Sequence, residues 1–319
     1  MSLESKLESI STLSYAIIGA GALGGFYGGL LAKSGLDVHF LARSDTDHIR
    51  SHGLRVDSIH GDFVVKPAQA YPNSQSMPRC DVIIIALKST QNHLLRDLIT
   101  PLLKEDSVVL VLQNGLHVES DSEAVVGPGR VMGGCCFLCS NKVGPGHIRH
   151  MDYGHIAMGA YLGEDGKNPA VPIAIQTAIH QDFLNAGIRV ELVENLQYSR
   201  WKKLMWNIPF NGLSVVMDAP TDQVMNSQTA RQLAIDLMRE TQASAKACGI
   251  VIADTEIDQM IVYTDSMVPY DSSMRLDFLA GRAMEIEAIV GRPLREAIRF
   301  GLVPKKIEML YHQLCFLQN

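Results

Sequence analysis

The sequence predicts an α/β protein of two domains, the first built on a parallel sheet and the second on helices alone. Three observations lead to this prediction. A short apolar strand, a glycine-rich turn and a helix follow one another from Ser14. Residues 81–87 and 107–112 are near-continuous apolar runs, typical of strands buried on both faces of a parallel sheet. After about residue 194 the apolar residues take on helical spacing, and the length of 319 residues exceeds the roughly 250–300 that one core usually supports.

The first domain begins with a strand predicted over Ser14–Ile18 and a turn over Gly19–Gly24. A helix over Phe26–Ser34 follows, and Gly35 ends it, as glycine often does just past a last helical turn. The next strand is predicted over Asp37–Ala42. Alternation of such strands with helical segments predicts repeated strand–helix–strand units.

The second domain is predicted to be all helical. Its helices are expected over residues 196–217, 226–248, 254–264 and 273–299, with a last helix after Pro304. We therefore divide the chain into a polar leader (1–14), an α/β domain (15–194) and a helical domain (195–319).

The balance of charge argues against a nucleic-acid partner. The chain has 28 basic and 34 acidic residues and a formal net charge of −6, whereas nucleic-acid binding generally relies on a basic surface. Six cysteines with no secretory signal before them indicate reduced thiols, so a cytoplasmic location is expected.

One stretch near the N-terminus has the length of a membrane span. Residues Tyr15–Ala32 carry no charge over 18 positions, which is enough for a minimal transmembrane helix. Six glycines within the stretch would make it a poor isolated helix, and the order of strand, turn and helix accounts for them better. We therefore predict no membrane association.

The turn over Gly19–Gly24 has the pattern G-x-G-x-x-G. In a dinucleotide-binding turn of the Rossmann type, the first glycine allows the tight turn, the second lets backbone N–H groups approach a pyrophosphate, and the third lets helix and strand pack closely. The N-terminus of the following helix attracts the negative charge. We therefore predict a cofactor site at Gly19, Ala20, Gly21, Ala22, Leu23 and Gly24. The alternative is a glycine-rich turn that binds no ligand.

The residues after the second strand bear on the choice of cofactor. An acidic residue there would bind the ribose 2′-hydroxyl of NAD, but the strand runs into Arg43. A planar guanidinium pairs well with a 2′-phosphate, so we predict NADP(H) as the cofactor. Two alternatives stay open: a shifted strand end would bring Asp45 into place, or Arg43 is only a solvated charge.

Polar side chains also follow the two later strands. Lys88 comes directly after one of them, and Gln113, Asn114 and Gly115 follow the other. Ligands of open α/β sheets bind at the carboxyl ends of the strands, so these residues are expected to share one crevice. A surface lysine and a plain turn are the competing interpretations.

A lysine and two asparagines lie on one face of the first helix of the second domain. Lys203, Asn207 and Asn211 are spaced i, i+4, i+8 among large apolar residues. A lysine buried in such surroundings needs a partner or a task, because burial of its charge costs free energy. Spacing alone does not separate this interpretation from a solvated stripe, and Pro209 inside the helix predicts a kink.

Ser272 and Ser273 precede a predicted helix. A serine is a good N-cap, and a capped N-terminus also suits a substrate carboxylate. Glu285 lies twelve residues beyond Ser273, which is about 18 Å along an unbroken helix. Unless the helix bends or starts late, the two residues are expected to contact opposite ends of a substrate and cofactor pair.

One group of cysteines and histidines has the composition of a zinc site. Cys136, Cys139, His147 and His150 are spaced more tightly than in usual zinc fingers, and residues 135–139 have the pattern of a buried strand. We therefore predict neither a metal nor a redox pair.

Together these motifs resemble those of the ketopantoate reductase (2-dehydropantoate 2-reductase) family. The resemblance extends from about Tyr15 to the C-terminal helices, with the motifs in the same order and at similar spacing. The segments that carry it are GAGALG at 19–24, the strand ending in Lys88, QNG at 113–115, WKKLMWNIPFN at 201–211, SSMRLD at 272–277 and MEIEAIVG at 284–291.

The resemblance implies a Rossmann NADP-binding domain and a helical substrate and dimerisation domain, with the active site in the cleft between them. It implies that Lys203 is the catalytic lysine. The substrate-binding positions that it implies are Lys203, Asn207, Asn211, Ser272 and Ser273. The cofactor contacts that it implies are Lys88, Asn114, Glu285 and, through its backbone, Cys139. Two departures affect the substrate side: Tyr270 stands where some members have a substrate-binding asparagine, and Pro209 lies between the two asparagines.

The expected activity is the NADPH-dependent reduction of ketopantoate to pantoate, in pantothenate and coenzyme A biosynthesis, with Lys203 as the general acid. The alternatives are reduction of another 2-keto acid by the same residues and non-catalytic binding of NADP(H). The expected partner is a small-molecule 2-keto acid, and the assembly that we consider is a homodimer.

Overall fold

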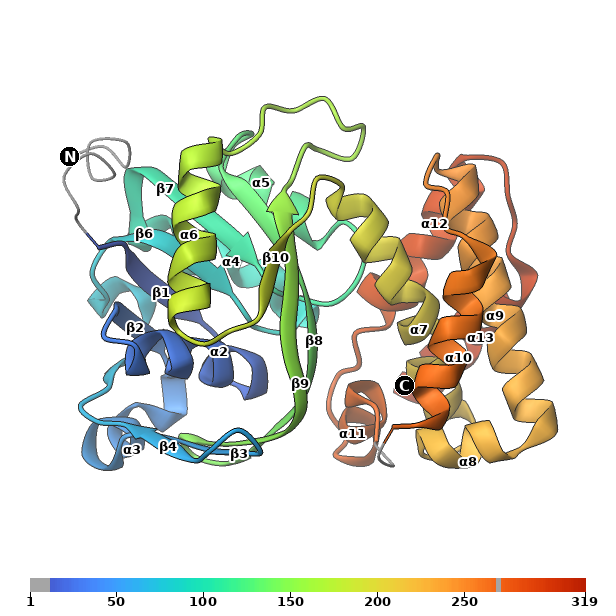
Figure 1. The fold of residues 1–319 in the computed structure, drawn as a ribbon, viewed down its shortest axis with the longest axis horizontal. Coiled ribbons are helices and arrows are strands. Elements are labelled where there is room, and N and C mark those ends of the chain that lie inside the picture. Colours follow the sequence, from blue (N-terminus) through green and yellow to red (C-terminus); the bar gives the residue numbers. More distant parts are fainter. Residues whose placement is uncertain (1–11, 268–270) are drawn as a thin grey trace. The chain divides into compact units, whose positions relative to one another are not determined.

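The computed structural model describes residues 12–267 and 271–319 and divides into two compact units (Figure 1). Unit 1 comprises the chain up to Gln113 together with Val118–Leu196. Unit 2 comprises Gln197–Asn319 and also the short segment Asn114–His117. Unit 1 is a sheet with helices packed on it, and the described elements of unit 2 are helical.

The sheet of unit 1 is mixed. Its strands are β1 (Ser14–Ile18), β2 (Asp37–Leu41), β3 (Leu54–Ser58), β4 (Phe63–Val65), β5 (Gln69–Tyr71), β6 (Cys80–Ile85), β7 (Leu103–Val111), β8 (Val131–Gly144), β9 (His147–Ala160) and β10 (Val190–Leu192). Their order is β4-β3-β9-β8-β7-β6-β1-β2-β5, with β10 beside β9. The β3–β4 and β8–β9 pairs are antiparallel, whereas the other pairs are parallel.

The register of the central strands brings four strand ends level with one another. Ile18, the last residue of β1, pairs with Leu41 of β2 and with Ile85 of β6. Ile85 in turn pairs with Val111 of β7. The residues that follow these four strands therefore start from the same edge of the sheet, which is the edge where ligands of open α/β sheets bind.

Two of the helices that share a buried cluster with the sheet of unit 1 pack on the same strand. They are α2 (Ala22–Lys33) and α6 (Ile173–Asn185), and α6 is the yellow-green helix that lies across the sheet in Figure 1. The cluster joins Tyr15 and Ile17, alternate residues of β1, to Phe26 of α2 and Ile179 of α6. Alternate residues of a strand point to the same face, so α2 and α6 pack on one face of β1.

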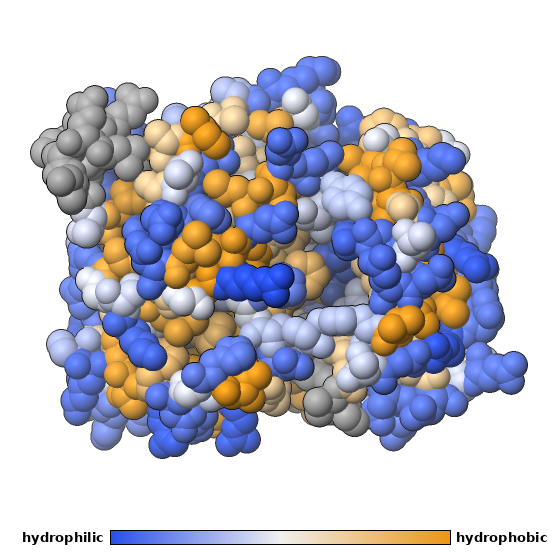
Figure 2. All heavy atoms as spheres, viewed as in Figure 1, coloured by the Kyte–Doolittle hydropathy of each residue, from blue (hydrophilic) through white to orange (hydrophobic). Residues whose placement is uncertain are grey.

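The remaining α-helices described in unit 1 are α3 (Thr46–His52), α4 (Leu95–Ile99) and α5 (Val118–Val126). Part of the surface of this unit is apolar. Ile173 and Leu184 of α6 are exposed, and Figure 2 shows hydrophobic residues among polar ones over the region of α6.

Unit 2 is built from helices around its own apolar core. The helices are α7 (Leu196–Val216), α8 (Thr221–Asn226), α9 (Gln228–Ala247), α10 (Asp254–Asp265), α11 (Ser273–Leu279), α12 (Arg292–Arg299) and α13 (Lys305–Gln318), and a π-helical turn (Glu287–Gly291) precedes α12. Buried residues of α7, α9 and α13, such as Trp201, Leu237 and Leu310, form one cluster.

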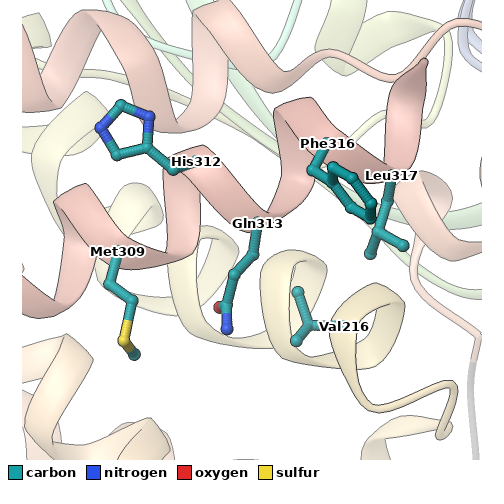
Figure 3. A pocket seen from close by; sticks show the side chains of 6 residues that line it. All are labelled: Val216, Met309, His312, Gln313, Phe316 and Leu317. Atoms are coloured by element: carbon teal, nitrogen blue, oxygen red, sulfur yellow. The ribbon is translucent and has the colours of Figure 1, made fainter.

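A shallow groove of about 530 Å³ lies on the surface of unit 2 (Figure 3). It is lined by Val216 of α7 and by Met309, His312, Gln313, Phe316 and Leu317 of α13. None of the residues expected to bind cofactor or substrate lines this groove.

Several predicted elements have nearly the expected bounds, but two helices do not. The strand over Ser14–Ile18 is confirmed, and α2 begins at Ala22, earlier than predicted. The single helix expected over 273–299 is wrong: α11 ends at Leu279, and Gly281 has a left-handed φ of +62°. The N–H of Arg282 then bonds back to the carbonyl of Asp277, at 2.8 Å, so the helix cannot continue and the 18 Å spacing estimated for an unbroken helix does not apply.

The sheet also departs from the parallel arrangement that was expected. Strands β8 and β9 form a long antiparallel ribbon that turns at Pro145 and Gly146, where Gly146 has φ +57°. The apolar run that suggested a membrane span forms β1 and α2 of unit 1. Among the described residues, no helix combines the length and the apolar character that crossing a bilayer requires.

Candidate cofactor-binding and catalytic residues

The three motif glycines of the turn after β1 differ in what surrounds them. A Cβ at Gly19 would lie 2.7 Å from the backbone N of Leu87, and this glycine has φ +103°. A Cβ at Gly24 would lie 2.1 Å from the carbonyl oxygen of Gly19, so helix and turn can pack only without it. A Cβ at Gly21 would meet no atom within 4 Å. Gly19 and Gly24 are therefore required by the fold, whereas Gly21 is not.

The position of Gly21 fits a diphosphate group. Gly21 is the N-cap residue of α2 and provides no side-chain cap, and the first turn of α2 contains no acidic residue. The first N–H groups of a helix have no intrahelical acceptor and carry partial positive charge, which attracts an anion. The open space at Gly21 lets an anion approach these groups closely.

Arg43 and Asp45 lie beyond the end of β2 in different environments. Arg43 is exposed and has a left-handed φ of +52°. Asp45 is only 5% exposed, and its carboxylate contacts the Nζ of Lys142 at 2.6 Å and accepts a hydrogen bond from Gly146 N at 2.9 Å. Burial alone would raise the pKa of Asp45, but these two partners outweigh it and lower the pKa. The carboxylate of Asp45 is thus bound to other residues of unit 1. This favours Arg43, not Asp45, as the residue beside a ribose.

The loops after β6 and β7 are joined by hydrogen bonds. Lys88 is half-buried and precedes a short 3₁₀ helix over Ser89–Leu94. The side chain of Gln113 donates to the carbonyl of Leu87 at 2.9 Å and to the Oδ1 of Asn92 at 2.6 Å. These bonds hold the loop that carries Lys88 at the strand edge where the glycine turn also starts.

Cys139 lies on β8, close to the start of α2. The next residue, Ser140, donates a hydrogen bond from its hydroxyl to the carbonyl of Ala22 at 3.4 Å. Burial raises the pKa of the Cys139 thiol to about 11, so the side chain is an uncharged thiol at neutral pH. A contact with a cofactor would therefore involve the backbone of Cys139, as the family resemblance implies.

The two cysteines and two histidines that have the composition of a zinc site do not gather at one point. Cys136 and Cys139 are buried in β8, as the strand pattern predicted, while His147 pairs with Asp57 at 2.7 Å and His150 contacts the hydroxyl of Ser58 at 2.8 Å. The six cysteines are free thiols. In the described parts of the chain, no three His, Cys, Asp or Glu side chains converge on a common metal position.

Lys203 of α7 is held by a residue far away in the sequence. Its Nζ donates to the Oδ1 of Asn114 at 2.5 Å, across 89 residues of chain, and both residues belong to unit 2. The neighbouring Lys202 pairs instead with Glu256 of α10 at 2.9 Å. The two adjacent lysines therefore have distinct partners, and Asn114 lies with the lysine in the helical unit.

Asn207 and Asn211 follow Lys203 at one-turn intervals on α7. They are 5% and 3% exposed, and neither side-chain amide has a hydrogen-bond partner in the described part of the chain. Buried amides are normally hydrogen-bonded, so these two side chains retain capacity to bind a polar ligand. Helix α7 continues through Pro209, so the lysine and both amides share one element.

Ser272 and Ser273 have different surroundings at the start of α11. Ser272 is fully buried, caps the helix by accepting from Arg275 N at 3.2 Å, and shares a hydrogen bond of 2.7 Å with the hydroxyl of Ser214. Ser214 also donates to the carbonyl of Asn211 at 3.1 Å. Ser273 is half-buried, which leaves it as the serine that a substrate carboxylate could reach. Tyr270 lies outside the described residues.

Glu285 lies in the segment between α11 and the π-helical turn. It is 7% exposed. The preceding residue, Met284, donates its N–H to the Oε1 of Gln318 near the end of α13, at 2.7 Å. The last helix of the chain therefore helps to fix the backbone next to Glu285.

The parallel central strands, the glycine turn and the open N-terminus of α2 are those of a Rossmann-type dinucleotide-binding domain, the class of domain found in nicotinamide-dependent oxidoreductases. Comparison with known proteins gives the family. Residues 15–163 match the family model described as "Ketopantoate reductase PanE/ApbA", and residues 195–318 match the model of its C-terminal part. The chain belongs to the ketopantoate reductase family, whose members use NADPH, and it is an NADP-dependent oxidoreductase.

Individual relatives agree with this assignment. A 2-dehydropantoate 2-reductase of Nostoc sp. is 49% identical over 305 residues, which cover 96% of this chain and 95% of the relative. The crystal structure of a 2-dehydropantoate 2-reductase from Geobacter metallireducens is 38% identical, with a TM-score of 0.91 and coverage of 95% and 99%. D-mandelate dehydrogenase in complex with NADH and anilino(oxo)acetate is 24% identical, with a TM-score of 0.84 and coverage of 96% and 98%, and shares the fold alone.

Proposed function

We propose that this chain reduces 2-dehydropantoate (ketopantoate) to pantoate with NADPH, as a step of pantothenate biosynthesis, and that Lys203 is the general acid. The observation that carries the proposal is the side-chain set on α7. There the ammonium of Lys203 is held by Asn114, and the amides of Asn207 and Asn211 follow on the same face with no side-chain hydrogen bond to any described residue. The identity of 49% to the Nostoc 2-dehydropantoate 2-reductase supports the choice of substrate.

The reaction adds a hydride and a proton across a ketone. Bound NADPH supplies the hydride for the ketone carbon. The ammonium of Lys203 donates its proton to the carbonyl oxygen, and its positive charge stabilises the negative charge that develops on that oxygen. The hydrogen bond to Asn114 Oδ1 restricts where the ammonium lies, which supplies part of the orientation that the transfer requires.

The remaining polar groups orient the substrate. Each amide of Asn207 and Asn211 offers both a donor and an acceptor, which suits a hydroxyl group and a keto oxygen. Ser273 is assigned to the substrate carboxylate. The hydroxyl of Ser272 already bonds to Ser214 and to Arg275 N, so Ser272 supports this position through the backbone.

On the cofactor side, we assign the pyrophosphate to the Gly19–Gly24 turn and the 2′-phosphate to Arg43. Lys88, Asn114, Glu285 and the backbone of Cys139 are the further cofactor contacts. We assign the other cofactor contacts to residues 15–194, and substrate binding together with the cofactor contact of Glu285 to residues 195–319. A cytoplasmic homodimer completes the proposal; a ketopantoate reductase of Staphylococcus aureus described as dimeric, 22% identical, shares the fold.

The substrate is tested by following NADPH oxidation with ketopantoate and with a panel of other branched 2-keto acids, repeated with NADH. We expect the highest kcat/KM for ketopantoate with NADPH. A higher kcat/KM for another 2-keto acid would assign the same residues to a different substrate. Equal use of NADH would remove the role given to Arg43. Calorimetric binding of NADPH without oxidation by any keto acid would make the chain a binding protein.

The same assay tests the acid with a matched pair of variants. Lys203→Ala is expected to lower kcat by about 10²–10⁴-fold, the usual contribution of a positioned general acid. Lys202→Ala removes the adjacent lysine, which pairs with Glu256, and is expected to leave kcat within about twofold because surface charge pairs contribute little. Near-normal turnover in a folded Lys203→Ala protein would refute the assignment.

A further inference from the structure

The π-helical turn at Glu287–Gly291 leaves one carbonyl group without its usual donor. The N–H of Arg292 donates to the carbonyl of Glu287, five residues back. In an α-helix that N–H would bond to Ala288 instead. The next candidate donor is the N–H of residue 293, which is a proline and has none. The carbonyl of Ala288 is therefore available to another part of the chain.

The segment Asn114–His117 takes up this carbonyl. The N–H of Leu116 donates to Ala288 O at 2.9 Å. The guanidinium of Arg292 adds bonds from its Nη1 to the carbonyl of His117 at 2.7 Å and, more weakly, to that of Leu116 at 3.4 Å. The π-turn thus accepts a hydrogen bond from the N–H of Leu116, and Arg292, the first residue of α12, donates to two carbonyls of the same short segment.

The approach of this segment to the π-turn is close. A Cβ at Gly115 would lie 2.4 Å from Ala288 O, and Gly115 has φ +112°, so only glycine fits this position without a shift. Leu116 is fully buried in the core of unit 2. The segment is therefore anchored on both sides of its backbone, immediately after Asn114.

We propose that the π-turn, through Ala288 O and Arg292, positions the catalytic lysine. It fixes the backbone of Asn114–His117, and Asn114 Oδ1 at the head of this segment then holds the Nζ of Lys203 at 2.5 Å. Arg292 and Ala288 are positioning residues, because they act on Lys203 through Asn114. The inference rests on the proposed role of Lys203 as the general acid.

Lys203 needs such positioning because a lysine side chain is long and flexible. A displacement of about 1 Å at a reacting group can lower a rate about 10²-fold. Sub-ångström placement of Asn114 by Arg292 therefore affects turnover. π-Helical turns inside helices are rare and frequently lie at functional sites, which agrees with this role.

The test compares three variants of the full-length protein. Arg292→Ala removes the guanidinium bonds to the carbonyls of Leu116 and His117 and is expected to lower kcat about 10- to 100-fold. KM for the keto acid should change less than about twofold because Asn207 and Asn211 are untouched. Arg292→Lys keeps one donor within reach of His117 O and is expected to recover part of the rate. Arg295→Ala is the matched control. It removes a guanidinium of α12 that bonds Glu287 of the same turn at 2.5 Å, and among the described residues Arg295 does not contact Asn114–His117. This variant should leave kcat within about twofold.

A second measurement does not depend on turnover. Modification of Lys203 by an amine-acylating reagent, quantified by mass spectrometry of the peptide that contains it, is expected to speed up several-fold in Arg292→Ala and not in Arg295→Ala. Equal kcat losses in the two alanine variants would overturn the proposal. A kcat loss in Arg292→Ala with unchanged labelling of Lys203 would also overturn it.

Failure of the proposed function would give a different pattern. Lys203→Ala would then keep its turnover, whereas the labelling difference between Arg292→Ala and Arg295→Ala would remain. The positioning role of Arg292 and the general acid role of Lys203 are thus tested separately.

Discussion

Two glycines of one turn illustrate how differently single residues contribute to fold and to function. A Cβ at Gly24 would lie 2.1 Å from the carbonyl oxygen of Gly19, inside the protein itself. A Cβ at Gly21 would meet no protein atom within 4 Å. The same substitution at the two positions therefore separates the requirement of the fold from the requirement of the cofactor.

We expect Gly21→Ala to fold with an unchanged thermal midpoint but to bind NADPH at least about 10-fold more weakly, because the methyl group occupies the space through which the pyrophosphate approaches. Gly24→Ala should lower the thermal midpoint, since the turn must move away from α2. Calorimetric titration and thermal unfolding measure the two effects. Normal NADPH binding by Gly21→Ala would show that the pyrophosphate lies elsewhere.

Single residues were predictable from the sequence where local spacing carries the information. Lys203 was singled out by its spacing from Asn207 and Asn211 on one helix. Its contact with Asn114 was not predictable, because 89 residues separate the two and Asn114 follows a strand of the other unit. The role of Arg292 was missed, although a glycine and a proline on either side of it are a sign of disturbed helix bonding.

At the scale of elements, the start of α11 is tied to α7 through buried hydroxyl groups. Ser272 contacts Ser214 of α7 at 2.7 Å, and Ser214 contacts the carbonyl of Asn211 at 3.1 Å. The backbone of a proposed substrate-binding asparagine is thereby linked to the residue before Ser273. Ser214 was not among the residues expected from the sequence, because nothing in its local pattern distinguishes it from a core serine.

This arrangement predicts that substitution of one serine lowers stability, whereas substitution of the adjacent serine weakens substrate binding. Ser272→Ala should lower the free energy of unfolding by about 1–3 kcal/mol, since it removes the helix cap and leaves Ser214 with one partner fewer. Ser273→Ala should leave stability within about 0.5 kcal/mol and raise KM for the keto acid about 10-fold. Denaturant unfolding and steady-state kinetics distinguish the two. The reverse result would exchange the roles of the two serines.

The bounds of an element were predictable where one sequence signal dominated, and the predictions failed where several signals competed. The strand β1 and the helix α7 were expected at almost their observed bounds, from continuous apolarity and helical periodicity. The helix over 273–299 was not one helix, because Gly281 adopts a left-handed φ and the chain turns back before Glu285. The β8–β9 ribbon was expected only in part, since strand pairing between distant residues is not visible in local sequence.

At the scale of the whole molecule, the two units can be observed separately. Both tryptophans of the chain, Trp201 and Trp206, lie on α7 of unit 2. Intrinsic tryptophan fluorescence therefore reports on unfolding of unit 2 alone. This allows an acid-stability experiment on Glu287, whose carboxylate contacts Tyr311 and Arg295 within unit 2.

Burial alone would raise the pKa of Glu287, but the hydrogen bonds from Tyr311 and Arg295 outweigh it and lower the pKa below 4.5. A carboxylate whose pKa is lowered by folding stabilises the protein above its unfolded pKa, and this contribution disappears as the pH falls through the folded pKa. Unit 2 should therefore lose stability as the pH falls below about 4.5. The Glu287→Gln variant should be less stable than the unchanged protein at pH 7, and acidification should lower its stability by a smaller amount.

The measurement is the urea midpoint of tryptophan fluorescence at pH 7 and at about pH 3.5, the latter below the unfolded pKa of a glutamate. Glu308→Gln, at an exposed pair with Lys305 on α13, is the control and should behave like the unchanged protein. An identical acid response of Glu287→Gln and the unchanged protein would contradict the assignment.

The membership of Asn114–His117 in unit 2 has a consequence for exchanging parts between relatives. The helical unit is not one continuous stretch of sequence, because the chain enters it at Asn114, leaves it after His117 and enters it again at Gln197. A chimaera joined only near residue 196 would combine the helices of one parent with the lysine-holding segment of the other. Recombination that preserves the unit must transfer both segments together, so the four residues after Gln113 should vary in concert with the helices and not with the sheet.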